Sequence, residues 1–170
     1  MEQKLDLTFR KYRIESKTPI MQPNPAYVTE LIELVNHSPY PLHLPFKLVL
    51  IELDQSRIAL EIMECHMQPF RMVHGGVIAT LIDTATFWAA FLRLPEDNGL
   101  VNVDLKLNYL RSVSDGSLIA AGRCLKSGRT LSYAEASVTD AQGALIAHGA
   151  STLMAMPGKG IRLGVPKFLE

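Results

Sequence analysis

The sequence has no excess of charge of either sign, because 17 lysines and arginines balance 17 aspartates and glutamates over 170 residues. A nucleic-acid-binding protein usually carries a basic excess or a clustered basic stripe, so this balance argues against one. Cysteine is scarce: Cys65 and Cys124 lie far apart in no CxxC pair, and the five histidines show no ligand spacing. These absences argue against a disulfide scaffold and predict no metal site.

Leader-like segments and long apolar runs are missing as well. Residues 1–6 are too polar for a signal peptide. The most apolar run, Val77 to Leu92, contains Asp83 and three threonines, and it is shorter than the roughly 20 residues of a bilayer span. We therefore expect a cytoplasmic protein with no membrane partner.

The composition suits one ordinary domain, since 48% of the residues are apolar and 20% are charged. We predict a single domain over residues 1–170 with a core at about 40–155. Before this core lies an N-terminal extension, in which the alternation of Leu5, Leu7 and Phe9 favours a short strand. The glycine-containing tail, 157–170, is expected to be loose.

Periodicity and turn signals predict the order of elements. Asn24-Pro25 is a good helix start, so a helix is expected at about 25–37, followed by a hairpin from Phe46 to Glu64. A long helix, apolar nearly all round, runs from the His74 region to Leu94. The predicted strands after it cover 101–109, 118–125, 130–138 and 144–154. These elements predict an α+β fold, in which a curved antiparallel sheet wraps around a long central helix.

Asp83 is the residue that fits this buried helix least. An unpaired carboxylate in an apolar setting is costly, so it must be paired, protonated or facing a wet cavity. At offsets of 3, 4 and 7 residues it shares one helical stripe with Gly76, Thr80, Thr84 and Phe87. The helix alone leaves two readings open: a structural carboxylate bonded to threonines, and a catalytic base or nucleophile.

His74-Gly75-Gly76 marks the point where loop becomes helix. Glycines there let a ligand approach the backbone closely. The free N–H groups and the positive end of the helix dipole can stabilise a developing oxyanion. A turn that needs glycine only for its backbone geometry is the alternative, and the motif by itself leaves it open.

The spacing of these two features bears on assembly. Gly76 and Asp83 are seven residues apart, which is about 10 Å along a helix axis. One reacting carbonyl must lie about 3 Å from both its activating donors and its attacking group. If both features act on one carbonyl, we expect them to come from two chains, with the central helices antiparallel about a two-fold axis.

The run HGGVIATLIDTA, from His74 to Ala85, resembles the signature of the phenylacetate-pathway (PaaI-like) branch of hot-dog-fold acyl-CoA thioesterases. That branch includes thioesterase superfamily member 2. The likeness covers roughly residues 40–155, with the strand from Val101 to Leu110 and the hairpin from Lys126 to Leu131. It implies the hot-dog fold, homodimers often paired into homotetramers, and hydrolysis of acyl-CoA without metal or cofactor.

The resemblance also implies roles by position. Asp83 matches the catalytic carboxylate, the Gly75 and Gly76 backbone matches the oxyanion site, and His74 matches the histidine that supports it. Gln68 falls where relatives often carry an asparagine that positions the reacting groups. Glutamine keeps the amide on a longer side chain, and this is a departure from the family pattern.

Further positions are implied for substrate binding. Asn102 falls where some relatives have a serine or threonine that orients water. The turn from Lys126 to Arg129 falls where relatives meet the CoA nucleotide, and its two cations suit phosphate, although a merely solvated turn is equally open. The residues assigned to substrate binding are Thr84, Asn102, Lys126, Ser127, Gly128 and Arg129.

These assignments predict an acyl-CoA thioesterase. The amides at 75–76 would polarise the carbonyl, and Asp83 of the partner chain would activate a water or attack directly. One alternative is an enoyl-thioester hydratase or dehydratase, with His74 and Asp83 as acid and base; another is a non-catalytic acyl-CoA-binding module. Phe87, Trp88 and Phe91 could shape an acyl or aryl pocket, or be plain core.

Overall fold

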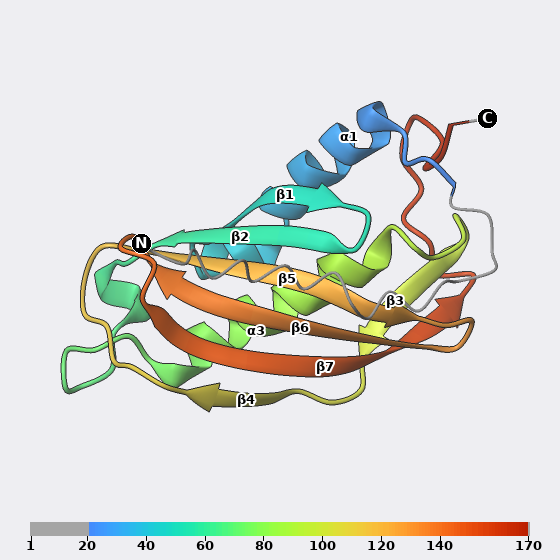
Figure 1. The fold of residues 1–170 in the computed structure, drawn as a ribbon. Coiled ribbons are helices and arrows are strands. Elements are labelled where there is room, and N and C mark those ends of the chain that lie inside the picture. Colours follow the sequence, from blue (N-terminus) through green and yellow to red (C-terminus); the bar gives the residue numbers. More distant parts are fainter. Residues whose placement is uncertain (1–20, 170) are drawn as a thin grey trace, which may run out of the picture.

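Seven strands form one curved antiparallel sheet in the computed structural model of the protein, which describes residues 21–169 (Figure 1). The order across the sheet is β1-β2-β5-β6-β7-β3, and β4 pairs with β7 beyond the end of β3. The strands are Lys47–Glu52 (β1), Gln55–Glu61 (β2), Asn98–Asn102 (β3), Lys106–Tyr109 (β4), Ser117–Ser127 (β5), Leu131–Asp140 (β6) and Leu145–Pro157 (β7). The strand predicted around Leu5 and Phe9 lies outside the described residues.

The long helix α3, Gly75–Phe91, lies in the curve of this sheet (Figure 1). Helix and strands approach very closely at one point, where a Cβ on Gly122 of β5 would lie 2.2 Å from the carbonyl oxygen of Ala85. The hydroxyl of Ser56 on β2 donates to the same oxygen at 2.6 Å. Glycine at position 122 therefore lets the sheet close on the helix, and the predicted sheet wrapped around a central helix is confirmed.

The N-terminal half of the sequence follows the prediction closely. Helix α1, Pro25–Asn36, starts where predicted, and the side chain of Asn24 accepts the Ala26 N–H at 3.0 Å. The expected hairpin is formed by β1 and β2, which pair antiparallel. Two short helices were not predicted: α2, Pro39–His43, and the 3-10 helix η1, Glu64–His66. Within residues 21–169, every helix falls short of the length and apolarity needed to cross a bilayer.

The strand predicted from Val101 to Tyr109 is two strands, β3 and β4. The Thr152 N–H donates to the carboxylate of Asp104 at 2.8 Å, so a side chain replaces a strand carbonyl at this point. Val103 is 51% exposed, although its place in the alternation would put it inside. The prediction was wrong here because the apolar alternation continues through the break and hides it.

The tail was expected to be loose, and this was also wrong. Lys167 is fully buried, and its ammonium donates to the carbonyl oxygens of Phe91 and Leu94, both at 2.9 Å. The hydroxyl of Tyr27 on α1 donates to the Ile161 carbonyl at 2.8 Å. Because the lysine satisfies carbonyls at the end of α3, the tail is held between α1 and that helix end. Helix α3 ends at Phe91, three residues before the predicted end.

Candidate active site

One face of α3 is left partly open by the chain's own sheet. Gly76 is exposed and Ala79 half-buried, whereas Leu81 and Ile82 on the covered faces are fully buried. The half-buried polar and aromatic residues of the open face are Thr80, Asp83, Thr84 and Phe87. This open face, from Gly76 to Phe87, is the stripe that the helical spacing predicted, and we call it the seam.

Asp83 lies in the middle of the seam and is held by Asn102 from β3. The Asn102 Nδ2 donates to the Asp83 Oδ1 at 2.5 Å. Burial raises the pKa of Asp83 above its ordinary value, and the hydrogen bond from Asn102 opposes that rise. The Asn102 Oδ1 is buried and has no hydrogen-bond partner among residues 21–169. The site thus contains a carboxylate with a raised pKa beside an acceptor that is still unsatisfied.

The start of α3 is built around His74, whose ring caps the helix. The His74 Nδ1 accepts the Gly76 N–H at 2.8 Å, so one of the two predicted amide donors is occupied. The Gly75 N–H has no acceptor within residues 21–169. The positive end of the helix dipole therefore presents one free amide, at Gly75, to an incoming anion.

Each glycine at this helix start also has a packing reason. A Cβ on Gly75 would lie 3.1 Å from the ring of Tyr109, and a Cβ on Gly76 would lie 2.9 Å from the His74 Nδ1. The Tyr109 hydroxyl donates to the Gly75 carbonyl at 3.0 Å, which ties β4 to the start of α3. Glycine here serves close packing as well as any ligand approach, and Tyr109 was not among the predicted site residues.

His66 contacts His74 through the backbone, and it was not among the predicted site residues either. The His74 N–H donates to the His66 carbonyl at 2.8 Å. The His66 ring is fully buried, and its Nδ1 accepts the Met63 N–H at 3.0 Å, so Nε2 carries the proton. Burial lowers the pKa of His66, which keeps the ring neutral. A lone histidine in an irregular segment gave no sequence signal for this role.

Gln68 belongs to the loop before α3, and its contacts are local. Its Oε1 accepts the Phe70 N–H at 2.6 Å, and its carbonyl accepts the Arg71 N–H at 2.9 Å. Arg71 has a positive φ of 65°, which closes this tight loop. The structure therefore places Gln68 on the His74 side of the site and gives it no contact with Asp83.

The turn from Lys126 to Arg129 lies at the other end of α3 (Figure 1). It is closed by the Gly128 N–H, which donates to the Leu131 carbonyl at 2.9 Å. Leu131 pairs with Met154, which in turn pairs with Val101 on β3. Lys126 and Arg129 are exposed, and within one chain this turn meets neither the helix start nor Asp83.

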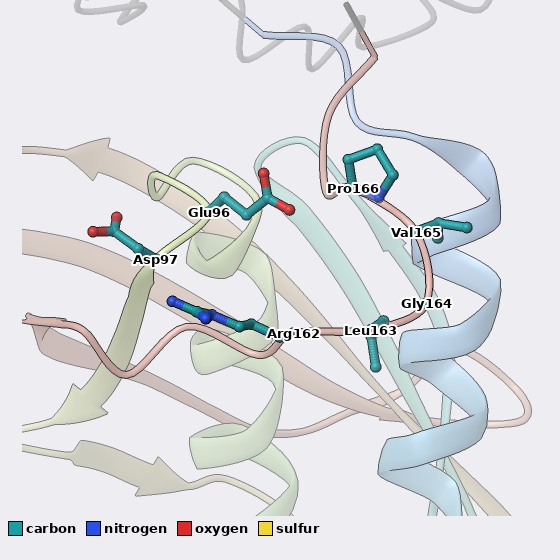
Figure 2. Close-up of a pocket in the computed structure, with 7 residues that line it drawn as sticks. All are labelled: Glu96, Asp97, Arg162, Leu163, Gly164, Val165 and Pro166. Atoms are coloured by element: carbon teal, nitrogen blue, oxygen red, sulfur yellow. The ribbon is translucent and has the colours of Figure 1, made fainter.

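Two cavities within residues 21–169 lie away from Asp83, which lines neither of them. One, of about 510 Å³, lies between the tail and the loop after α3 and is lined by Glu96, Asp97 and residues 162–166 (Figure 2). The other, of about 290 Å³, is on the outer face of β4, β6 and β7 near Tyr133 and His148. Asp83 and its neighbours on the seam are half-buried in a single chain.

Residues 21–169 hold no group of three or more His, Cys, Asp or Glu side chains placed to bind a metal ion.

Comparison with known proteins agrees with this architecture. A family model described as "Thioesterase superfamily" matches residues 70–147. Mouse acyl-coenzyme A thioesterase 13 is 30% identical over 95 residues, which are 55% of this chain and 67% of that protein. A Haemophilus influenzae protein named "Putative esterase" is 37% identical over 65 residues, 38% of this chain. The chain spans only 47% of the length of that protein.

The fold is shared with solved structures. A crystal structure of a thioesterase from Haemophilus influenzae superposes with a TM-score of 0.73 at 24% identity, covering 81% of this chain and 95% of that one. The predicted hot-dog fold is thereby confirmed.

Proposed function

The chain belongs to the thioesterase superfamily, and we propose that it hydrolyses acyl-CoA thioesters to a free carboxylic acid and CoA. The observation that carries the proposal is Asp83, a carboxylate with a raised pKa on the half-buried seam of α3, held by a hydrogen bond from Asn102. The proposed chemistry uses no metal or organic cofactor.

The single hydrogen bond from Asn102 supports a role for Asp83 as general base. Asn102 occupies the Asp83 Oδ1, which leaves the other carboxylate oxygen to accept a proton from water. A water that donates to this free oxygen keeps a lone pair directed away from it. Such a water faces whatever carbonyl lies over the seam.

The oxyanion donor in this scheme is the Gly75 N–H at the start of α3. Asp83 follows it by eight residues, which is about 12 Å along the helix axis. Both groups cannot reach one carbonyl within a chain, since each must lie about 3 Å from it. We therefore propose a homodimer in which each of two sites combines Gly75 of one copy with Asp83 of the other.

Two further features support an assembly through this face. Strand β3 ends the sheet order, and its outer edge pairs with no other strand among residues 21–169. Free strand edges are normally paired or protected. The seam beside it leaves Asp83 and Phe87 only half-buried. Two copies joined edge to edge would cover both features at once.

The turn from Lys126 to Arg129 fits the same arrangement. In an antiparallel dimer, the end of one α3 lies near the start of the other. The turn and Asp83 of one copy would then serve the site that Gly75 of the second copy completes. Two exposed cations there suit the phosphates of CoA. Pairing of dimers into tetramers would leave this site unchanged.

The proposed reaction proceeds in two steps. Water attacks the thioester carbon while Asp83 takes its proton, and the oxyanion formed is held by the Gly75 N–H. The C–S bond then breaks, and the protonated Asp83 returns its proton to the departing thiolate. A raised pKa suits this cycle, because Asp83 must hold the proton between the two steps.

The experiment is thiol release from a panel of short, medium, long and aryl acyl-CoAs, with wild type and Asp83→Asn measured side by side. We expect turnover on at least one class and a loss of about 10²- to 10⁴-fold in the variant. Cys65 is exposed and reacts with thiol dyes, so an enzyme-only blank is subtracted. Light scattering checks that the variant keeps the dimer.

Near wild-type turnover by Asp83→Asn would contradict the proposed role. Tight binding of CoA esters without thiol release would identify a binding module. Hydration of crotonyl-CoA would instead identify a hydratase of the same superfamily.

A further inference from the structure

A second side chain reaches the seam, from the edge of the sheet opposite Asn102. The hydroxyls of Tyr40 and Thr80 lie 2.7 Å apart. Tyr40 is on α2, directly before the edge strand β1, whereas Asn102 is on the other edge strand, β3. The seam is thus bracketed by an amide on one side and by a phenol on the other.

Tyr40 is held in this place but not buried there. Its ring packs edge-on against Phe46, with the ring centroids 6.0 Å apart and the planes at 69°, and the residue is 54% exposed. Thr80 precedes Asp83 by three residues, so their side chains are neighbours about 5–6 Å apart on the helix surface. A group bound at Asp83 therefore lies within one helical turn of the two hydroxyls.

The two hydroxyls have hydrogen-bonding capacity to spare. One hydrogen bond between them uses one of their two protons. The second proton has no acceptor among residues 21–169, and lone pairs on both oxygens remain free. A hydroxyl on a bound ligand could donate to this pair and accept from it.

We propose that Tyr40 and Thr80 select the acyl group, and that they favour an acyl chain with a hydroxyl close to the thioester, as in a 3-hydroxyacyl-CoA. This deepens the proposed function and rests on it. A hydroxyl oxygen three bonds from the thioester carbon lies on the scale of the separation between Thr80 and Asp83. An unsubstituted chain would leave the pair facing hydrocarbon, with its hydrogen bonds to water lost.

The test compares butyryl-CoA with the two enantiomers of 3-hydroxybutyryl-CoA. We expect the wild type to have a higher kcat/KM for one hydroxylated enantiomer. Tyr40→Phe and Thr80→Val should each lower that value about tenfold, while the kcat/KM for butyryl-CoA should not fall. Thr80→Ser keeps the hydroxyl and should keep the preference.

The matched control is Tyr133→Phe, which removes the same hydroxyl from the outer face of the sheet. Its neighbour Ala134 is buried, so Tyr133 points away from α3. The ratio of kcat/KM for 3-hydroxybutyryl-CoA to kcat/KM for butyryl-CoA should not change in this variant. If Tyr40→Phe lowers kcat/KM for both esters equally, the hydrogen bond between Tyr40 and Thr80 only holds α2 in place, and the inference is overturned.

Binding separates this inference from the proposed function. Non-hydrolysable thioether analogues of butyryl-CoA and 3-hydroxybutyryl-CoA are titrated into wild type and Tyr40→Phe by calorimetry. A preference for the hydroxylated analogue that Tyr40→Phe abolishes supports the inference even if no ester is hydrolysed. Equal wild-type affinity for the analogues contradicts it, whether or not the protein is a hydrolase.

Discussion

The two ends of α3 solve the same problem in opposite ways. Every helix leaves unpaired N–H groups at its start and unpaired carbonyls at its end. At the end of α3 the chain supplies its own partner, the buried ammonium of Lys167, which donates to Phe91 and Leu94 and lies 4.1 Å from the centre of the Phe91 ring. At the start, the Gly75 N–H has no acceptor among residues 21–169.

The difference indicates which end has a role beyond stability. Burying a lysine costs solvation free energy, and desolvation lowers the pKa of Lys167 to about 8. The fold accepts that cost to satisfy carbonyls at one helix end, yet at the other end His74 caps only the Gly76 N–H and the Gly75 N–H stays unpaired within residues 21–169. An amide left unpaired by a chain that can cap a helix so fully is available for a ligand.

The largest expected effect comes from filling the open end. In Gly75→Val the new side chain would collide with Tyr109, since even a Cβ lies 3.1 Å from that ring. The amide should move and kcat should fall about 10²- to 10³-fold, as for loss of an oxyanion donor. Steady-state kinetics on the best ester measures this. Unchanged kcat would remove Gly75 from the mechanism.

The next effect comes from opening the closed end. Lys167→Met keeps an apolar stem but leaves two carbonyls without their donor, so the free energy of unfolding should fall by about 1–3 kcal/mol. Urea denaturation measures it, with the exposed Lys159→Met as control. Activity well below the unfolding transition should stay near that of wild type. A loss of kcat under these conditions would show that the Lys167 end of α3 also affects activity, which would contradict the comparison.

The closed end should also show a dependence on pH. The folded pKa of Lys167, about 8, is below the ordinary 10.5, so between these values the unfolded chain binds more protons. The stability contribution of Lys167 should therefore rise from about pH 8 towards pH 10. Urea denaturation at pH 7.5 and 9.5 shows this as a gain in wild type that Lys167→Met lacks. Equal gains in wild type and Lys167→Met would show that another group causes the dependence of stability on pH.

The smallest expected effect concerns the free-energy cost of partly burying the Asp83 carboxylate. The pKa of Asp83 is raised in the folded chain, so its ionised form opposes folding above the ordinary carboxyl range, and the cost is absent in acid. Asp83→Asn should raise the melting temperature slightly at pH 7 and not at pH 3. Circular dichroism melts at both pH values test this, and a loss of stability at pH 7 would mean that Asp83 is structural.

Helical spacing was enough to predict the half-buried face of α3. The 3.6-residue period placed Thr80, Asp83 and Thr84 on one stripe, and such a stripe needs no knowledge of distant contacts. The hydrogen bond from Asn102 to Asp83 could not be derived in this way, because it joins a strand to a helix across a long separation. That residue entered the prediction only through family resemblance.

The missed features share a different physical cause. Helix α2 was not predicted, yet Pro39 is tolerated in its first turn, and this helix brings Tyr40 to the seam. The glycines of the tail indicated looseness, while one buried lysine holds it. In both cases a single tertiary contact outweighs the local signal, and local patterns do not contain it.

The most direct test of a shared site is a mixed dimer. Asp83→Asn and Gly75→Val chains carrying different tags are co-expressed, and the dimer that contains both is purified. One of its two sites would combine two intact groups and the other none, so the proposal predicts about half the wild-type kcat per dimer, although each parent dimer is inactive. A mixed dimer as inactive as its parents would show that Gly75 and Asp83 must belong to one chain, and would contradict the shared site.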